Sequence, residues 1–305
     1  GIDSSIIQTH AKLNSFLKIA YSMFESSEIP PFWVAILNSY YDCVCVPDKW
    51  LVDVYKDCGV QIPIFVLPLG IWIEDFLAEP IYKRDESKPF TFGMTASFHE
   101  RKNHIKVLDA FKQSKFANDP NYLLKLHGRF GPQKELIEKA VKAYGLSNVQ
   151  FLSGRFSDKE YLEFMKSLDC YVFISKGEGF SITPREAKAL GTPVILSQNT
   201  AHLSIDCCYM IKSNIKVPAM YELFGNKQLG NFYDCNVDDV TKTMEGIVDG
   251  TIKINDFLTL EEDAGNEIIY SYSGREIVKK YLWENLRKQY LQLLKPTNVI
   301  FDTWN

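Results

Sequence analysis

Two glutamates, Glu178 and Glu186, are separated by seven residues and frame a loop that contains Gly179. An apolar run precedes this loop, and a short helix is predicted to follow it, with Pro184 at the first helical position. A helix N-terminus attracts a phosphate, whereas carboxylates accept hydrogen bonds from sugar hydroxyls. The pattern predicts a ligand with hydroxyls on both sides of its phosphates, such as a nucleotide-sugar. For either glutamate alone, a helix cap or a solvent-exposed position is the simpler interpretation.

Two cations, Arg101 and Lys102, come just before another predicted helix, over residues 103–116. Placed there, a guanidinium and an ammonium group can meet a diphosphate beside the positive end of the helix dipole. By themselves these residues and Asn103 are a weak signal, because a polar turn has the same composition. Together with the two glutamates, they favour a site for a nucleotide diphosphate.

These loops belong to a regular alternation of apolar runs and amphipathic stretches. Strands are predicted at Phe90–Met94, Tyr122–Leu126, Val149–Leu152, Cys170–Ile174, Val194–Leu196 and Cys208–Ile211, and helices at 103–116, 133–144, 158–167 and 184–190. Such an alternation makes a parallel sheet with helices on both faces. We therefore predict an α/β, Rossmann-like domain that binds its ligand at the carboxyl ends of the strands.

A smaller region of the same style comes first, with strands predicted at Lys18–Ser22, Cys43–Val46 and Ile64–Leu67. A polar stretch bracketed by prolines then reads as a linker. The predicted organisation is a partial Rossmann-like domain over residues 1–78, a linker over 79–89, a ligand-binding domain over 90–272 and a C-terminal segment over 273–305. Within that last segment one continuous helix is predicted from Ser273 to Leu294, packing back on the N-terminal domain.

Length and composition exclude several classes of protein. The 305 residues suit two domains, and a formal net charge of −4 argues against a nucleic-acid binder. No apolar run is long enough to predict a membrane-spanning helix. The seven cysteines include no Cys-x-x-Cys pair, so we predict reduced thiols in a cytoplasmic protein and no zinc site. The chain also lacks the Gly-x-Gly-x-x-Gly run of a dinucleotide-dependent dehydrogenase.

The segment Glu178-Gly-Phe-Ser-Ile-Thr-Pro-Arg-Glu186, followed by Ala-Lys-Ala-Leu-Gly-Thr-Pro-Val-Ile, resembles the Glu-x7-Glu signature of glycosyltransferase family 4. This family, also called glycosyl transferases group 1, contains retaining enzymes with the GT-B fold. The resemblance implies that Glu178 lies at the donor sugar and that Glu186 binds the ribose hydroxyls. It places the backbone amides of Gly179, Phe180 and Ser181 near the sugar and the diphosphate.

The same resemblance implies a role for Lys102, which would neutralise the departing diphosphate. The family usually has an arginine several residues earlier, where this chain has Ala96 and Ser97. Arg101, at the adjacent position, is its expected substitute. Lys102, Arg101 and Glu178 are thus the predicted catalytic residues.

Two further loops extend the predicted donor site. Gly128 ends a predicted strand where the family has a turn against the nucleotide, and Arg155 and Phe156 resemble the neighbours of the base. His127 is read equally well as an ordinary buried histidine or as part of this site.

The resemblance implies transfer of a sugar, with retained configuration, from a UDP- or GDP-sugar to a hydroxyl of a glycan, lipid or protein. It implies no metal and no other cofactor, because cationic side chains take the metal's place. Peripheral membrane contact is compatible with the family. The resemblance begins at about residue 18 and lacks the first half of the family's N-terminal domain. The alternative is therefore a non-catalytic nucleotide-sugar-binding module or a fragment of a larger glycosyltransferase.

Overall fold

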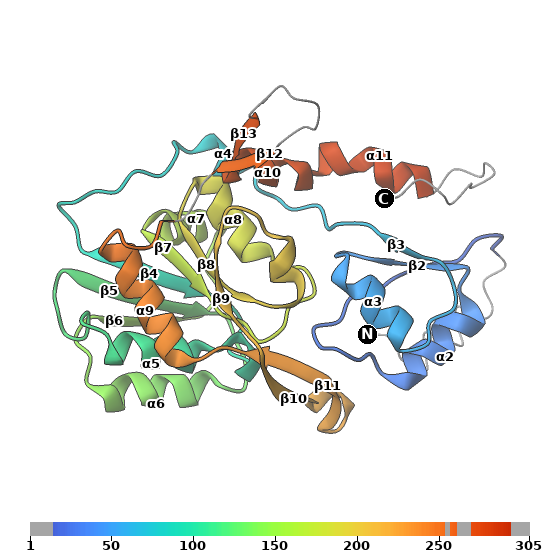
Figure 1. Cartoon of the computed structure of the whole chain (residues 1–305), viewed down its shortest axis with the longest axis horizontal. Helices are drawn as coiled ribbons and strands as arrows, with labels where there is room; N and C mark the ends of the chain where they lie inside the picture. The colour runs from blue at the N-terminus through green and yellow to red at the C-terminus, as the bar shows by residue number, and fades with distance from the viewer. Residues whose placement is uncertain (1–14, 254–256, 261–269, 294–305) are drawn as a thin grey trace.

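The computed structural model describes residues 15–253, 257–260 and 270–293, and in this part the chain forms a large and a small α/β lobe (Figure 1). The outer limits of the predicted domains, at residues 1 and 305, lie outside the described residues. The large lobe contains a six-stranded sheet in the order β6-β5-β4-β7-β8-β9, in which every neighbouring pair is parallel. Its strands are β4 (Phe90–Thr95), β5 (Tyr122–Gly128), β6 (Val149–Ser153), β7 (Cys170–Phe173), β8 (Val194–Gln198) and β9 (Tyr209–Lys212). All six strand predictions are confirmed.

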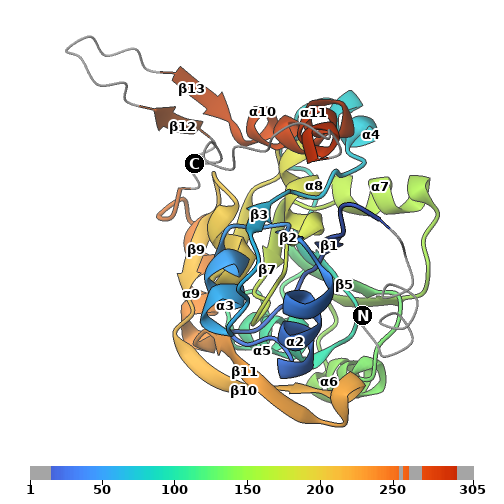
Figure 2. The same cartoon turned by 90° about the vertical axis from the view of Figure 1, so that its right-hand side faces the viewer.

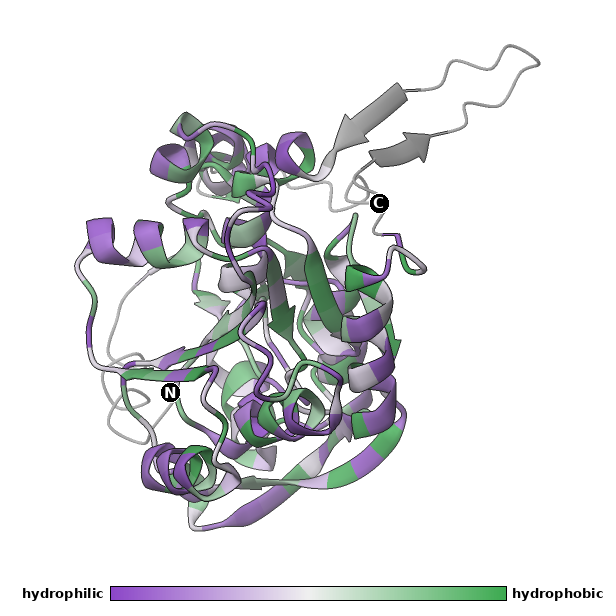
Figure 3. Cartoon of the chain, turned by 90° about the vertical axis from the view of Figure 1, so that its left-hand side faces the viewer, coloured by the Kyte–Doolittle hydropathy of each residue, from purple (hydrophilic) through white to green (hydrophobic). Residues whose placement is uncertain are grey.

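Helices cover this sheet and bury its apolar strands. Figure 3 shows the central strands as the most hydrophobic ribbons, with hydrophilic residues on the outer faces of the helices. The helices are α5 (His104–Gln113), α6 (Lys134–Tyr144), α7 (Asp158–Lys166), α8 (Ile182–Leu190) and α9 (Val237–Val248). Helix α7 begins with a capping box, in which Ser157 and Glu160 satisfy each other's backbone N–H groups.

Helix α8 begins two residues earlier than predicted, at Ile182, so Pro184 is its third residue and not its first. The first four N–H groups of a helix have no partner within the helix, and a proline is therefore tolerated at this position. Gly191 ends α8 in the left-handed conformation, as expected of a C-terminal glycine (φ 80°).

The small lobe has three parallel strands in the order β1-β2-β3. They are β1 (Ile19–Tyr21), β2 (Cys43–Val46) and β3 (Ile64–Val66), and the helices are α2 (Pro31–Tyr40) and α3 (Trp50–Asp57). Phe24, Trp33, Leu37, Val44 and Tyr55 form the centre of a separate apolar core. The three predicted strands are confirmed, and the lobe faces the viewer in Figure 2.

An antiparallel hairpin that was not predicted joins the two lobes. It consists of β10 (Ile215–Tyr221) and β11 (Lys227–Asp234) and extends from the large lobe to the small one (Figures 1 and 2). Leu229 enters the apolar core of the small lobe. Ser26 donates a hydrogen bond from Oγ to the Leu229 carbonyl at 2.7 Å, and the Ser27 N–H donates to the Asn231 carbonyl at 3.2 Å. The hairpin therefore contributes to the apolar core of the small lobe.

The prediction of one continuous C-terminal helix is wrong. The chain forms α10 (Gly274–Val278), a 3₁₀ turn (Lys279–Tyr281) and α11 (Trp283–Leu293), and Leu294, the predicted end, lies outside the described residues. Leu282 interrupts the helix with an extended backbone (φ −59°, ψ 140°). This break lets Tyr281 and Leu282 enter the core of the large lobe while α11 turns away toward the small lobe (Figure 1).

The C-terminal segment also contacts the crossover between the lobes. The Ile71 N–H donates to the Tyr281 carbonyl at 2.9 Å, and the Tyr290 hydroxyl donates to the Pro68 carbonyl at 2.8 Å. The remaining elements are α4 (Glu74–Ala78) and an antiparallel pair, β12 (Phe257–Leu260) and β13 (Tyr270–Ser273). Among the described helices, none is both long and apolar enough to cross a membrane.

Candidate functional site

Two adjoining cavities open at the carboxyl ends of β4, β5 and β7. The first, of about 310 Å³, is called the ion-pair cavity, and its lining includes Met23, Glu25, Arg101, Lys102, Phe173, Glu178, Gly179, Phe180 and Ser181. The second, of about 410 Å³, is called the Glu186 cavity, and its lining includes His127, Arg129, Phe130, Phe156, Asp158, Tyr161 and Glu186. Both are also lined by Thr95, Ala96, Ser97, Ile182 and Thr183. One ligand can therefore extend from the first cavity into the second.

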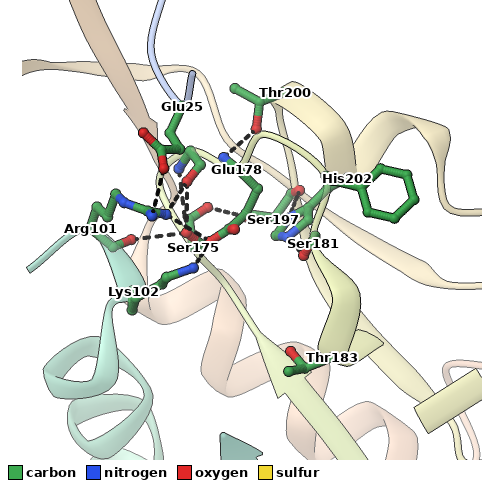
Figure 4. Close-up of polar contacts among 12 residues, drawn as sticks. Glu25, Arg101, Lys102, Ser175, Glu178, Ser181, Thr183, Ser197, Thr200 and His202 are labelled. Carbon is green, nitrogen blue, oxygen red and sulfur yellow. Dashed lines mark hydrogen bonds and ion pairs between the residues drawn. The ribbon is translucent and has the colours of Figure 1, made fainter. Parts of the chain in front are cut away.

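The ion-pair cavity contains a cluster of two cations and two carboxylates (Figure 4). Glu178 Oε1 accepts hydrogen bonds from Arg101 Nη1 at 3.0 Å and from Lys102 Nζ at 2.5 Å. Arg101 Nη2 also pairs with Glu25 Oε1 at 3.1 Å. Glu25 comes from the small lobe, so this cluster bridges the two lobes. Its formal charge is balanced.

Burial and charge together set the ionisation of this cluster. Burial alone would raise the pKa of Glu178, but Lys102 and Arg101 lower it to about 2. Burial lowers the pKa of Lys102 even though Glu178 favours its charged form. Burial also opposes the charge of Arg101, but Glu178 and Glu25 raise its pKa above the ordinary value. Glu178 is therefore an anion at neutral pH and keeps two cations in the cavity.

The loop that carries Glu178 is fixed by its neighbours along both flanks. The Glu178 N–H donates to Thr200 Oγ1 at 2.9 Å, and the Glu178 carbonyl accepts from the Ala201 N–H at 3.3 Å. A Cβ atom at Gly179 would lie 2.1 Å from Met23 Cγ, so a side chain at this position would collide with the small lobe. Close approach between the lobes is thus the reason for glycine here.

A buried arginine holds the end of the same loop. Arg185, with a relative exposure of 1%, donates from Nη1 to the carbonyls of Phe180 and Ser181. Its guanidinium lies 4.0 Å from the Phe180 ring centre and 4.6 Å from the Tyr281 ring centre. Cation–π contacts of this kind strengthen when the cation is desolvated. The C-terminal segment therefore supports the loop through Tyr281.

The Glu186 cavity combines a carboxyl group with aromatic rings. The Tyr161 hydroxyl donates to Glu186 Oε2 at 2.6 Å, and burial raises the pKa of Glu186 to about 7 although this hydrogen bond lowers it. The rings of His127 and Phe156 stack with centres 3.9 Å apart. A planar base can lie against aromatic rings, while a carboxylate accepts hydrogen bonds from hydroxyls.

The structure brings most of the residues expected from the sequence into these two cavities. Arg101, Lys102, Glu178, Gly179, Phe180 and Ser181 line the ion-pair cavity, and Phe156, Glu186 and His127 line the Glu186 cavity. Gly128 and Arg155 line neither cavity. Arg155 is exposed, and Gly128 packs so tightly that a Cβ atom would lie 2.3 Å from the Ala96 carbonyl oxygen.

Sequence reasoning missed Met23, Glu25, Tyr161 and His202. The first two come from the small lobe, and the sequence gives no signal that they reach a loop more than 70 residues away, as in the Glu25–Arg101 pair (|i−j| = 76). Tyr161 lies within the predicted helix 158–167, and no motif in that stretch marks it as a residue of the site. Among the described residues, no group of three or more His, Cys, Asp or Glu side chains is arranged to hold a metal ion.

Part of the chain matches the model of a known protein family. Residues 79–205 match the family model "Glycosyl transferases group 1", and this segment contains both glutamates and both cations. A probable sucrose-phosphate synthase of Thermosipho melanesiensis is 25% identical over 259 residues, which are 82% of this chain and 51% of that protein. The chain thus spans about half the length of this curated relative.

Solved structures of glycosyltransferases share the fold. Anabaena Alr3699/HepE in complex with UDP-glucose superposes with a TM-score of 0.64 at 13% identity, over 90% of this chain and 71% of that one. Sucrose-phosphate synthase from Thermosynechococcus elongatus superposes with a TM-score of 0.61 at 20% identity, over 86% of this chain and 59% of that one. The predicted α/β fold of GT-B type is confirmed.

Proposed function

We propose that the chain, whose residues 79–205 match the Glycosyl transferases group 1 model, is a glycosyltransferase that takes its sugar from a nucleotide-diphosphate sugar. The observation that carries the proposal is the continuity of the two cavities. One contains Arg101 and Lys102 for a diphosphate, and the other contains aromatic rings and Glu186 for a nucleoside. Structures with this fold hold UDP and UDP-glucose, so a UDP-sugar is the first candidate donor and a GDP-sugar the second.

In the proposed mechanism, the chain stabilises charge on the leaving group. As the bond between the sugar and the diphosphate breaks, negative charge develops on the diphosphate oxygen. Lys102 and Arg101, which line the ion-pair cavity, stabilise this charge. Glu178 holds both cations in place and can accept hydrogen bonds from the sugar. Independence from metal ions is part of the proposal, because two side-chain cations supply the charge that a metal would otherwise bring. Retention of configuration is also part of the proposal and follows from the resemblance of the Glu178–Glu186 segment to the family.

The acceptor is proposed to be a hydroxyl of a glycan, lipid or protein that enters between the lobes. Glu25 and Met23 of the small lobe line the ion-pair cavity, so an acceptor that binds the small lobe can approach the sugar from that side.

A cytoplasmic location, expected from the reduced thiols, also belongs to the proposal. The seven cysteines, all within the described residues, form no disulfide.

Nucleotide binding tests the donor assignment directly. The melting temperature is to be measured with UDP, GDP, ADP and UDP-glucose, each with magnesium and with a chelator. A ligand at a hundredfold excess over its Kd adds about 2.7 kcal/mol to the stability of the folded state, so one nucleotide is expected to raise the Tm whether or not magnesium is present.

The reaction itself is then followed with the matching sugar donor and a panel of acceptors, and the anomeric configuration of the product is read by NMR. Stabilisation by a nucleotide without any transfer would support the non-catalytic binding module. No stabilisation by any of the nucleotides would contradict the donor site.

The affinity for UDP-glucose is expected to rise with pH because Glu186 must ionise to accept both ribose hydroxyls. With a pKa of about 7, the ionised fraction of Glu186 increases about tenfold between about pH 6 and about pH 8. The Kd should therefore fall by up to about tenfold over this range. UDP-glucose is the better probe than UDP, because its diphosphate has no ionisation near neutral pH.

The matched control is Glu186→Gln, which keeps the shape of the side chain and removes its titration. Calorimetry should give this variant a weak affinity that changes little with pH. An equally steep pH dependence in Glu186→Gln would assign the titration to another group.

A further inference from the structure

Ser181 precedes α8 but does not act as its cap. Serine is among the preferred residues at this position, where its hydroxyl usually accepts a hydrogen bond from the first turn of the helix. Here the Ser181 side chain makes no such bond. Its backbone is left-handed (φ 68°, ψ 80°), a conformation that persists in a residue other than glycine only where the surroundings hold it.

His202 holds the hydroxyl of Ser181 in another direction (Figure 4). The His202 side chain is fully buried in the 3₁₀ turn Thr200–Ser204, next to the ring of Phe173. Its Nε2 atom lies 3.1 Å from Ser181 Oγ. Because Ser181 lines the ion-pair cavity, His202 lies directly behind one wall of the proposed sugar site.

The other ring nitrogen of His202 fixes where the proton resides. Nδ1 lies 3.0 Å from the Ser197 carbonyl oxygen, which can only accept. The Ser197 hydroxyl, 3.1 Å from the same nitrogen, gives its own proton to the Ser175 carbonyl at 2.5 Å. Both groups require a proton on Nδ1.

The ring is also neutral. Burial lowers the pKa of His202 to about 4 although Glu178 raises it. In a neutral imidazole with its proton on Nδ1, Nε2 has only a lone pair. Ser181 must therefore donate its hydroxyl proton to His202, and only the lone pairs of Ser181 Oγ remain for the cavity.

We propose that His202 is a positioning residue that makes Ser181 an acceptor, and not a donor, toward the ligand in the ion-pair cavity. This inference rests on the proposed function and adds a determinant of donor specificity to it. A phosphate oxygen needs a donor and gains nothing from the Ser181 hydroxyl, whereas a sugar hydroxyl can give its proton to Ser181 Oγ. The arrangement therefore directs the sugar to Ser181 and leaves the diphosphate to Lys102 and Arg101.

The test compares two ligands in four forms of the full chain. Kd values for UDP and for UDP-glucose are to be measured by calorimetry for the wild type, Ser181→Ala, His202→Phe and the double variant. Phenylalanine keeps the buried aromatic volume beside Phe173 and removes the acceptor Nε2. Ser181→Ala is expected to weaken UDP-glucose about three- to tenfold, the effect of one hydrogen bond, and to leave the Kd of UDP within about twofold, as for an uninvolved residue.

The two substitutions should not be additive, because residues that act through one hydrogen bond are coupled. His202→Phe should weaken UDP-glucose selectively, and adding it to Ser181→Ala should cause no further selective loss. An equal loss for both ligands in Ser181→Ala, or fully additive effects, would overturn the role of His202. If His202→Phe does not fold, His202→Gln replaces it and is expected to keep the selectivity, since its amide can both donate and accept. Wild-type protein that binds neither ligand would instead contradict the donor site itself.

Discussion

Replacing Lys102 with alanine is expected to lower the rate of sugar transfer by about a hundredfold or more. Removing one group that stabilises charge in the transition state costs about 2.7–4 kcal/mol, or about 10²- to 10³-fold in kcat. Lys102 Nζ lies in the ion-pair cavity, and its side chain is 11% exposed, so water replaces the lost charge poorly. The loss should appear in kcat more than in the Kd of the donor, because charge develops on the diphosphate only as the bond breaks.

Lys112→Ala is the matched control for this experiment. Lys112 is an exposed lysine of α5, the helix that begins just after Lys102. Its ammonium group lies over the ring of Tyr144, 3.8 Å from the ring centre. Its replacement should leave kcat unchanged. A Lys102→Ala protein with full activity would contradict the proposed role of the cation, and an equal loss in Lys112→Ala would indicate general damage to α5.

Replacing Glu178 with alanine is expected to destabilise the fold by about 3–5 kcal/mol and to abolish transfer. Glu178 is the common partner of Arg101 and Lys102, and removal of one member of a buried ion pair leaves uncompensated charge in a low dielectric. Arg101 keeps Glu25 as a second partner, so the uncompensated charge in the variant is mainly that of Lys102. Urea denaturation at neutral pH measures the change in the free energy of unfolding.

The pH dependence distinguishes this cause from the loss of packing. The pKa of Glu178 is lowered to about 2 in the folded chain, so its contribution to stability is present above the unfolded value of about 4.5 and disappears as pH falls toward 2. The difference between wild type and Glu178→Gln should therefore shrink in acid, while a packing defect would persist. Glu163→Ala is the control, because its exposed pair with Lys166 contributes about 0–1 kcal/mol.

The parallel sheets could be predicted from the sequence because each strand is an apolar run between amphipathic stretches. The hairpin of β10 and β11 could not, since Pro218 interrupts the pattern of β10 and the register shifts between Pro218 and Met220. Proline lacks an N–H and is confined to edge strands and bulges, where sequence signals are weakest. The break in the C-terminal helix at Leu282 could not be predicted either. Leu282 packs into the core of the large lobe, and helix propensity gives no sign of this contact.

The candidate site could be predicted only where its residues are adjacent in the chain. Glu178 and Glu186 share one loop and helix, and Arg101 and Lys102 are neighbours, so both pairs were found. Glu25 and His202 each act through a contact that the fold creates. A lone buried histidine has no spacing to reveal it, and its role becomes visible only when the partner of each ring nitrogen is known.

The hairpin that joins the two lobes also affects the order in which the chain can fold during its synthesis. The core of the small lobe consists mainly of residues before position 61, yet Leu229 also belongs to it. Tyr290 contacts Pro68 in the crossover between the lobes. At about 5–20 residues per second, Leu229 leaves the ribosome roughly 10–40 s after Phe24. During that interval the nascent small lobe exposes apolar surface, because the residue that completes its core has not yet been synthesised.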